Sequence, residues 1–268
     1  MADQLLERYA LGRTPQEHDR LRKQARVWEA ATGRLFDETG LAPGASCLDA
    51  GCGPGETMRL MAERVGPTGR VLGVDVDADA DALAELPPQC AFQVHDVTAG
   101  DPIPGAPFDL VYARLLLFHL PQRVAVLARL WDAVAPGGHL LVQDYDLRAV
   151  SVLPALDSAE RIMQVMTAAF TTAGADVCAG ARLPQLFAQA GVGVPDGTDV
   201  AGRLEPLATG GTLIERTFRS VLPRAIAGGI VSESDGAAAL GAFERDMAAF
   251  GERPMLWPLL IGAWKRNG

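Results

Sequence analysis

The stretch LDAGCGPGE at residues 48–56 decides the fold, because it places a glycine-rich turn between an apolar run and a helical pattern. Residues 45–50 predict a buried strand, and residues 55–65 predict a helix with apolar side chains at i, i+3, i+4 and i+7. A strand that leads through glycines into a helix turns backbone N–H groups towards a ligand and lets that ligand approach closely. Several nucleotide-binding folds contain such a turn, so the stretch alone does not choose among them.

Apolar runs and helical patterns alternate along the chain after this turn. Further strands are predicted over residues 71–75, 91–96, 108–112 and 139–145, with helices over residues 77–86 and over the stripe Val124, Leu127, Trp131 and Val134, which Pro136-Gly137-Gly138 closes. Short buried strands that alternate with helices indicate βαβ units and a parallel sheet. Right-handed crossovers in such a sheet place the ligand crevice at the carboxyl ends of the strands.

The regions on either side of this alternation are predicted to be mostly helical. A helix is expected over residues 15–36, and beyond residue 151 the chain predicts helices over about 155–174, 181–190, 212–228 and 233–250, a loop over 191–211 and an edge strand over 255–264. We interpret the later helices as a lid over the crevice. The expected organisation is an N-terminal helical cap (1–44), a cofactor-binding core (45–150) and a helical lid with the final strands of the sheet (151–268).

Composition excludes several classes of partner. The 268 residues carry a net charge of −9 and include two lysines, Lys23 and Lys265, which argues against binding along a nucleic-acid backbone. The sequence predicts neither a membrane-spanning run nor a leader peptide, so we expect a cytoplasmic protein without a membrane partner. Its four cysteines are scattered without a paired motif, and no metal site is expected.

Carboxylates end or nearly end three successive predicted strands, at Asp49, Asp75 and Asp96. Asp75 is placed to accept both hydroxyls of a ribose, and Asp96 to accept from an adenine amino group. Carboxylates at these places suit an adenosine with a positively charged tail, whereas they repel a pyrophosphate. Asp is also favoured as a helix N-cap, and capping is the alternative interpretation of Asp75 and Asp96.

Taken together, residues 45–146 resemble the class I S-adenosylmethionine-dependent methyltransferases. The motifs that carry the resemblance are the glycine turn, residues 71–77, His95-Asp96-Val97, FDLVYARLLLFHL at 108–120 and VAPGGHLLVQD at 134–144. Upstream, Tyr9-Ala10-Leu11-Gly12, Glu17, Arg20-Leu21 and Gln24 are similar to a bacterial group that methylates natural-product-like small molecules on oxygen, nitrogen or activated carbon.

The resemblance implies an α/β fold with a Rossmann-like sheet, N-terminal helices and an inserted C-terminal helical lid. It implies S-adenosyl-L-methionine as the cofactor. The expected partner is a small-molecule acceptor of the secondary-metabolite type, and the enzyme is expected to be a monomer or a homodimer. The cofactor-binding residues it implies are Tyr9, Gln24, Asp49, Gly51, Gly53, Asp75, Val76, Asp96, Val97, Ala113 and Arg114. For Tyr9 and Gln24, packing of the N-terminal helix is the alternative, and for Arg114 a surface ion pair.

Methyl transfer needs a base only when the acceptor must lose a proton. His119 follows the fourth predicted strand, and imidazole titrates in the useful range, so it is the predicted base. The alternative is a structural histidine that packs before Pro121. Tyr145 and Asp144 at the end of the fifth strand are also expected to face the crevice, and Tyr145 is the second predicted catalytic residue.

Three other functions stay open at this point. An NAD(P)-dependent oxidoreductase shares the sheet, but the turn here has the spacing GxGxG rather than GxGxxG, and no tyrosine precedes a lysine by four positions. A non-catalytic S-adenosylmethionine-binding protein is the second alternative, which the long lid segment disfavours. Methylation of nucleic-acid bases is the third, and ARLL at residues 113–116 stands where an Asn/Asp-Pro-Pro-aromatic motif is expected.

Overall fold

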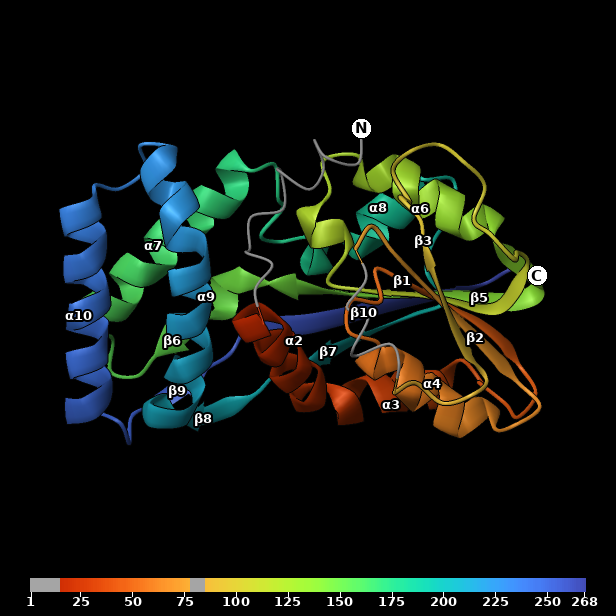
Figure 1. The fold of residues 1–268 in the computed structure, drawn as a ribbon, viewed down its shortest axis with the longest axis horizontal. Helices are drawn as coiled ribbons and strands as arrows, with labels where there is room; N and C mark the ends of the chain where they lie inside the picture. The colour runs from red at the N-terminus through yellow and green to blue at the C-terminus, as the bar shows by residue number, and fades with distance from the viewer. Residues whose placement is uncertain (1–14, 78–84) are drawn as a thin grey trace.

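The computed structural model describes residues 15–77 and 85–268, and these residues form a seven-stranded central sheet (Figure 1). In sheet order the strands are β3 (Cys90–Val94), β2 (Arg70–Asp75), β1 (Ser46–Ala50), β4 (Phe108–Arg114), β5 (Val134–Asp146), β10 (Leu259–Arg266) and β7 (Gly197–Ala201). The first five run parallel, whereas β10 pairs antiparallel with both β5 and β7. This is the expected Rossmann-like α/β architecture.

Helices cover both faces of the sheet (Figure 1). The lower layer in the figure holds α2 (Pro15–Val27), α3 (Glu29–Glu38) and α4 (Glu56–Val65), and the upper layer holds α6 (Arg123–Asp132) and α8 (Leu183–Gln189). Successive strand residues point to opposite faces, so Cys47 packs with the α3–α4 layer and Leu48 with the α6–α8 layer. Both residues have no exposed surface. Burial on both faces explains why these strands are continuously apolar.

A further layer stands at the carboxyl end of β5 (Figure 1). It consists of α7 (Asp157–Thr172), α9 (Leu207–Ala227), α10 (Glu233–Ala249) and a small sheet of β6 (Ser151–Val152), β9 (Pro254–Leu256) and β8 (Leu204–Pro206). We call it the C-terminal layer. Its apolar core is continuous with Tyr145 and Leu147 at the end of β5. The chain enters it twice, between β5 and β7 and again between β7 and β10.

The prediction that residues 255–264 form an edge strand of the sheet is wrong about the position of this strand. β10 lies inside the sheet, between β5 and β7, and Leu260 and Ala263 have no exposed surface. The true edge is β7, within the segment 191–211 that was predicted to be a loop. Its sequence, GTDVA, is polar because its residues are half-buried or exposed. Residues 254–256, at the start of the predicted edge strand, belong to the separate small sheet.

Two other predicted boundaries also differ. Residues 136–138 lie within β5 instead of closing the preceding helix, because the register between β4 and β5 shifts and accommodates the extra residues. The third strand ends at Val94, so Asp96 lies two residues beyond it. Most of the helix expected over residues 77–86 lies outside the described residues. Among the helices that the structure describes, none has the length and hydropathy needed to cross a membrane.

Candidate active site

A cavity of about 310 Å³ opens at the carboxyl ends of β1, β2 and β4. β1 lies between β2 and β4, so the crossovers leave it towards opposite sides and a crevice forms at this point of the sheet. Residues of α2, α7 and α9 close the other side of the cavity. The cavity therefore occupies the place that the strand pattern predicted.

Most of the predicted site residues line this one cavity. They are Gln24, Asp49, Gly51, Gly53, Asp75, Val76, Asp96, Val97, Arg114, His119 and Tyr145. Tyr9 lies outside the described residues. The prediction that Ala113 lies at the cofactor is corrected, because its side chain has no exposed surface and packs in the core shared with α6. Alternation along β4 turns Ala113 away from the cavity while the next residue, Arg114, faces it.

The glycine turn leaves open space at one point. Gly51, Gly53 and Gly55 all have positive φ, of 73°, 50° and 79°. A Cβ at Gly51 would come within 2.9 Å of the Leu116 side chain, whereas a Cβ at Gly53 would meet nothing within 4 Å. Gly53 also lines the cavity, so the empty space beside it is available to a ligand.

Asp75 connects the end of β2 to this turn. Its carboxylate accepts the backbone N–H of Gly53 at 2.9 Å and that of Asp77 at 3.3 Å. Burial raises the pKa of Asp75, although these hydrogen bonds oppose the shift. The carboxylate thus holds the turn and still borders the cavity with its other lone pairs.

Asp96 makes a local turn, but no helix begins in the described stretch between β3 and β4, so it is not the helix N-cap of the alternative interpretation. Its Oδ1 accepts the backbone N–H of Thr98 at 2.8 Å and the Thr98 hydroxyl at 2.7 Å. Both residues, together with Val97, line the cavity. Capping of this turn and a place on the cavity wall are therefore compatible for Asp96.

Asp49 is a buried carboxylate at the cavity floor, with 2% of its surface exposed. Among the described residues its Oδ2 has no hydrogen-bond partner. Burial raises the pKa of Asp49 to about 7, against the opposing charge of Arg114. A buried carboxyl oxygen without a partner is costly, so this position favours a ligand that brings a cation or a hydrogen-bond donor.

The prediction that Asp144 faces the crevice is also corrected, because Asp144 does not line the cavity. Its side chain is fully buried and accepts the backbone N–H groups of Phe118 at 3.0 Å and Tyr145 at 3.2 Å. Burial raises the pKa of Asp144 to about 7. It fixes the segment after β4 from behind instead of facing the crevice.

His119 reaches the cavity on a short 3-10 turn, η1 (Leu117–His119). The chain enters it through Leu115, whose left-handed φ of 55° costs a non-glycine residue about 1–3 kcal/mol. The imidazole lies edge-on to Phe118 and Phe170, with ring centroids 4.8 and 6.3 Å away. His119 therefore combines a position on the cavity wall with packing against aromatic rings.

Tyr145 on the cavity wall is held by Gln24 of α2 and by Trp28, which follows α2. Its hydroxyl accepts hydrogen bonds from Gln24 Nε2 at 2.8 Å and from Trp28 Nε1 at 2.6 Å. The Trp28 ring also lies edge-on to those of Tyr145 and Trp257, at 6.1 and 6.3 Å. Gln24 therefore packs the N-terminal helix and borders the cavity at the same time.

A family model for a methyltransferase domain matches residues 19–194, which include α3, the glycine turn and every parallel strand. The chain belongs to this family. Its fold and motifs are those of the class I S-adenosylmethionine-dependent methyltransferases.

Similar sequences carry methyltransferase names. Trans-aconitate 2-methyltransferase from Variovorax paradoxus is 38% identical over 115 residues, which are 42% of this chain and 44% of that protein. Methyltransferase str2 from Strobilurus tenacellus is 36% identical over 121 residues, 45% of this chain and 42% of that protein. The chain thus matches less than half the length of these relatives.

Solved structures share the fold along most of the chain. A putative methyltransferase from Bacillus halodurans superposes with a TM-score of 0.56 at 15% identity, covering 87% of this chain and 97% of that one. A cyclopropane-fatty-acyl-phospholipid synthase-like protein from Lactobacillus casei gives 0.56 at 17% identity, covering 98% of both chains. At these identities the likeness concerns the fold alone.

S-adenosylmethionine, the cofactor of this family, fits the residues present. Its ammonium and sulfonium groups are cations, and the unpartnered Asp49 oxygen lies on the cavity floor. Gly53 leaves space without a Cβ, and Asp75 offers acceptor lone pairs at the end of β2. Within the described residues no three His, Cys, Asp or Glu side chains gather as a metal site.

Binding of S-adenosylhomocysteine is expected to release a proton from Asp49. A bound ammonium group stabilises the ionised carboxylate and lowers its pKa, which is about 7 without ligand. Affinity should therefore rise with pH up to about 7 and then level off. Calorimetry in buffers of different ionisation enthalpy should detect nearly one released proton at about pH 6 and almost none at about pH 8.

The control for this prediction is Asp49→Asn, which should abolish the proton release. The raised pKa of Asp49 also makes the free energy of unfolding depend on pH. Between about pH 4 and 7 the folded protein retains the Asp49 proton, whereas the unfolded chain does not. Stability of the ligand-free protein should fall as pH rises through this window. A pH-independent affinity in the wild type contradicts the assignment.

Residues of the C-terminal layer on the cavity wall were not predicted individually. They are Met163, Met166 and Phe170 of α7, with Leu213, Ile214 and Thr217 of α9. Spacings of three and four residues along each helix could have shown that each group shares one face. No spacing could show which cavity that face covers. His95, to which sequence analysis gave no role, also lines the cavity.

Proposed function

We propose that the protein transfers the methyl group of S-adenosylmethionine to a small-molecule acceptor of the secondary-metabolite type, at oxygen, nitrogen or activated carbon. One observation carries the proposal: a single cavity is lined by the carboxylates and glycines of the turn and also by His119, Tyr145 and apolar side chains of α7 and α9. Such a cavity suits a cationic nucleoside next to an organic acceptor.

The cofactor supplies a methyl group on a sulfonium, which is already activated towards a nucleophile. Asp75 would accept the ribose hydroxyls, and Asp96 with Val97 would border the adenine. Asp49, Gly51 and Gly53 would hold the amino-acid end, with Gln24 and Arg114 beside them. By keeping both reactants in line and away from water, these residues supply orientation, which is a large part of the acceleration in such a transfer.

His119 and Tyr145 would act on the acceptor. His119 accepts the proton that the acceptor loses as its nucleophilic atom is methylated. The Tyr145 oxygen accepts hydrogen bonds from Gln24 and Trp28, which fix the position of its hydroxyl at the cavity wall. Together they orient the acceptor towards the methyl group.

The lining supports an uncharged acceptor rather than a polycarboxylate. Among the described residues of the cavity wall, Arg114 is the only lysine or arginine. Its guanidinium donates to the Thr32 hydroxyl at 3.1 Å and acts electrostatically on Asp49. An acceptor of the aconitate kind carries several carboxylates and would need more cations at hydrogen-bond distance.

The proposal is tested first through the turn, with Gly53→Ala and its matched control Gly40→Ala. Both glycines have positive φ (50° and 67°), and a Cβ at either meets nothing within 4 Å. Both variants should therefore lose a similar stability, about 1 kcal/mol. Calorimetry should show S-adenosylhomocysteine affinity reduced at least tenfold in Gly53→Ala alone, because only that Cβ enters the cavity.

Unchanged affinity in a folded Gly53→Ala variant contradicts this location of the cofactor. Wild-type protein should also bind S-adenosylhomocysteine and ignore NADH. Turnover is then sought with radiolabelled S-adenosylmethionine and a panel of uncharged phenols, amines and indoles. Incorporation of label into any of them establishes the activity.

A further inference from the structure

A second groove, of about 810 Å³, borders α7 and shares part of its lining with the cavity. Its walls come from residues 147–156, from α7 residues that include Ala159 and Ala168, and from Phe243 and Met255 of the C-terminal layer. Most of this lining is apolar, and Leu153 at its margin is 57% exposed. An exposed large aliphatic side chain beside an apolar groove favours a hydrophobic ligand.

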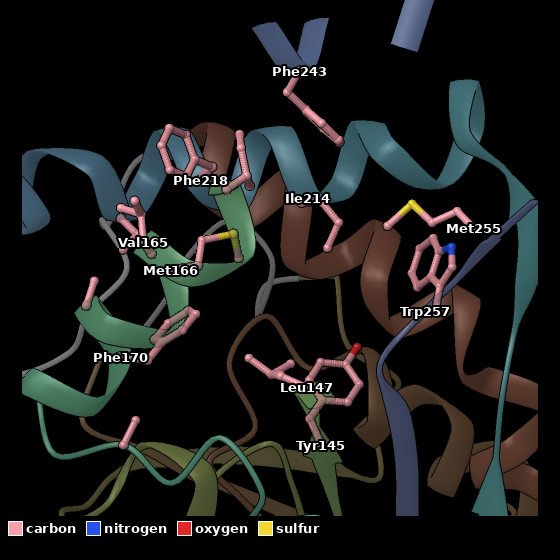
Figure 2. Packing of buried hydrophobic residues seen from close by; sticks show 14 of the residues in the cluster. Tyr145, Leu147, Val165, Met166, Phe170, Ile214, Phe218, Phe243, Met255 and Trp257 are labelled. Atoms are coloured by element: carbon pink, nitrogen blue, oxygen red, sulfur yellow. The ribbon is translucent and has the colours of Figure 1, made fainter. Parts of the chain in front are cut away.

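Three side chains form a common wall between the groove and the cavity. Leu147, Met163 and Ile214 line both spaces, and each comes from a different element. Figure 2 shows Ile214 of α9 pointing towards Leu147 and Tyr145 across the space beside α7. Leu147 and Ile214 are buried, at 9% and 7% exposure, and Met163 is half-buried. We call these three residues the common wall.

Met163 makes this wall adjustable. Methionine is unbranched and has three rotatable bonds, so it changes its shape at less cost than leucine or isoleucine does. Its neighbour on the same helix face towards the cavity, Met166, is similarly adaptable. Met163 lines both spaces, so a change in its side-chain conformation alters the separation between the cavity and the groove.

Charges in the groove do not favour an anionic end group. The arginine in its lining, Arg148, is paired with Asp146 at 2.5 Å. The carboxylate of Glu160 is the other charged group among the described lining residues. The remaining polar members are serine, threonine and glutamine side chains, which accept a neutral chain without leaving a buried charge unpaired.

We propose that the acceptor is an elongated, uncharged molecule whose reactive group lies beside His119 and Tyr145 and whose apolar end passes the common wall into the groove. This inference rests on the proposed function, because it extends the acceptor site assigned there. It predicts selection by the length of the apolar chain. Each methylene that enters the groove should tighten binding about two- to fourfold until the groove is filled.

The test measures binding of straight-chain primary alcohols, from hexanol to dodecanol, to the full-length protein by calorimetry. The series is run with and without saturating S-adenosylhomocysteine. Affinity should rise two- to fourfold per methylene in the wild type. Met163→Trp, which enlarges the common wall, should flatten this rise, and Ala159→Leu, which fills only the groove, should end it at a shorter chain.

Arg161→Ala is the matched control, because Arg161 is an exposed α7 residue that lines neither space. It should leave the chain-length series unchanged. Equal affinity for all the alcohols, or an identical series in wild type, Met163→Trp and Ala159→Leu, overturns the inference. Loss of S-adenosylhomocysteine binding in the wild type would instead overturn the proposed function, and the series without it would still report on the groove.

Discussion

With an acceptor that must lose a proton, His119→Ala is expected to lower kcat for methyl transfer by about 10²- to 10⁴-fold, which is the usual contribution of a general base. The imidazole lies on the cavity wall beside Phe118 and Phe170, at the end proposed for the acceptor. Affinity for S-adenosylhomocysteine should hardly change, because the carboxylates that would hold it come from other strands. Steady-state kinetics and calorimetry on the same preparation measure both quantities.

The pH dependence of the rate distinguishes a base from a packing residue. In the wild type, kcat should rise with pH through the titration of an imidazole, and this ascending limb should disappear in His119→Ala. A limb that survives the substitution contradicts the role of His119 as the base. Loss of thermal stability together with cofactor affinity would identify a structural histidine instead.

His139→Ala is the control for this experiment. His139 is half-buried in β5 and pairs in register with Leu110, near the start of β4 and away from the cavity. Burial and the nearby charge of Arg266 lower its pKa. Removing this imidazole should leave the ascending limb in place.

Asp75→Ala is expected to weaken S-adenosylhomocysteine binding by tens- to several hundred-fold. The substitution removes the proposed acceptor of the ribose hydroxyls, and charge-assisted hydrogen bonds contribute about 1.5–3 kcal/mol each at most. It also removes the acceptor of the Gly53 N–H, which loosens the glycine turn. Calorimetry on the folded variant gives the affinity, and circular dichroism checks the fold.

Asp109→Ala separates the loss of a ligand contact from the loss of a backbone hydrogen bond. Asp109 is exposed in β4 and accepts the Ser46 N–H at 2.8 Å, at the opposite end of the sheet. It resembles Asp75 in accepting a backbone N–H, but it does not line the cavity. Its removal should cost stability without changing affinity. Equal affinities in wild type and Asp75→Ala would remove Asp75 from the site.

Local sequence was sufficient to predict that the strand-end carboxylates and the glycine turn line one cavity. The carboxyl ends of parallel strands meet at one edge, so Asp49, Asp75 and Asp96 could be brought together from their positions in the strand pattern. Positive φ at Gly51 and Gly53 agrees with the choice of glycine there. These features depend on residues close in sequence and on a handedness that nearly all such sheets share.

The face of the sheet to which each strand residue points could be determined only from the structure, because a shift of one residue along the strand moves a side chain to the other face. Sequence analysis placed Ala113 at the cofactor and Asp144 at the crevice, and both are buried away from the cavity. Their neighbours Arg114 and Tyr145 face it instead. Position at the end of a strand is readable from the sequence, but the direction of a side chain depends on how that strand packs.

The order of the last strands and the cavity wall formed by α7 and α9 were decided by tertiary structure alone. The apolar β10 is an inner strand because the polar segment GTDVA pairs with its outer side, at a distance of about sixty residues in the chain. Met163 and Ile214 likewise meet Leu147 only after α7 and α9 pack on the end of β5. Motifs fix contacts between near neighbours, whereas these contacts arise from packing between segments whose apolar faces could have paired in several ways.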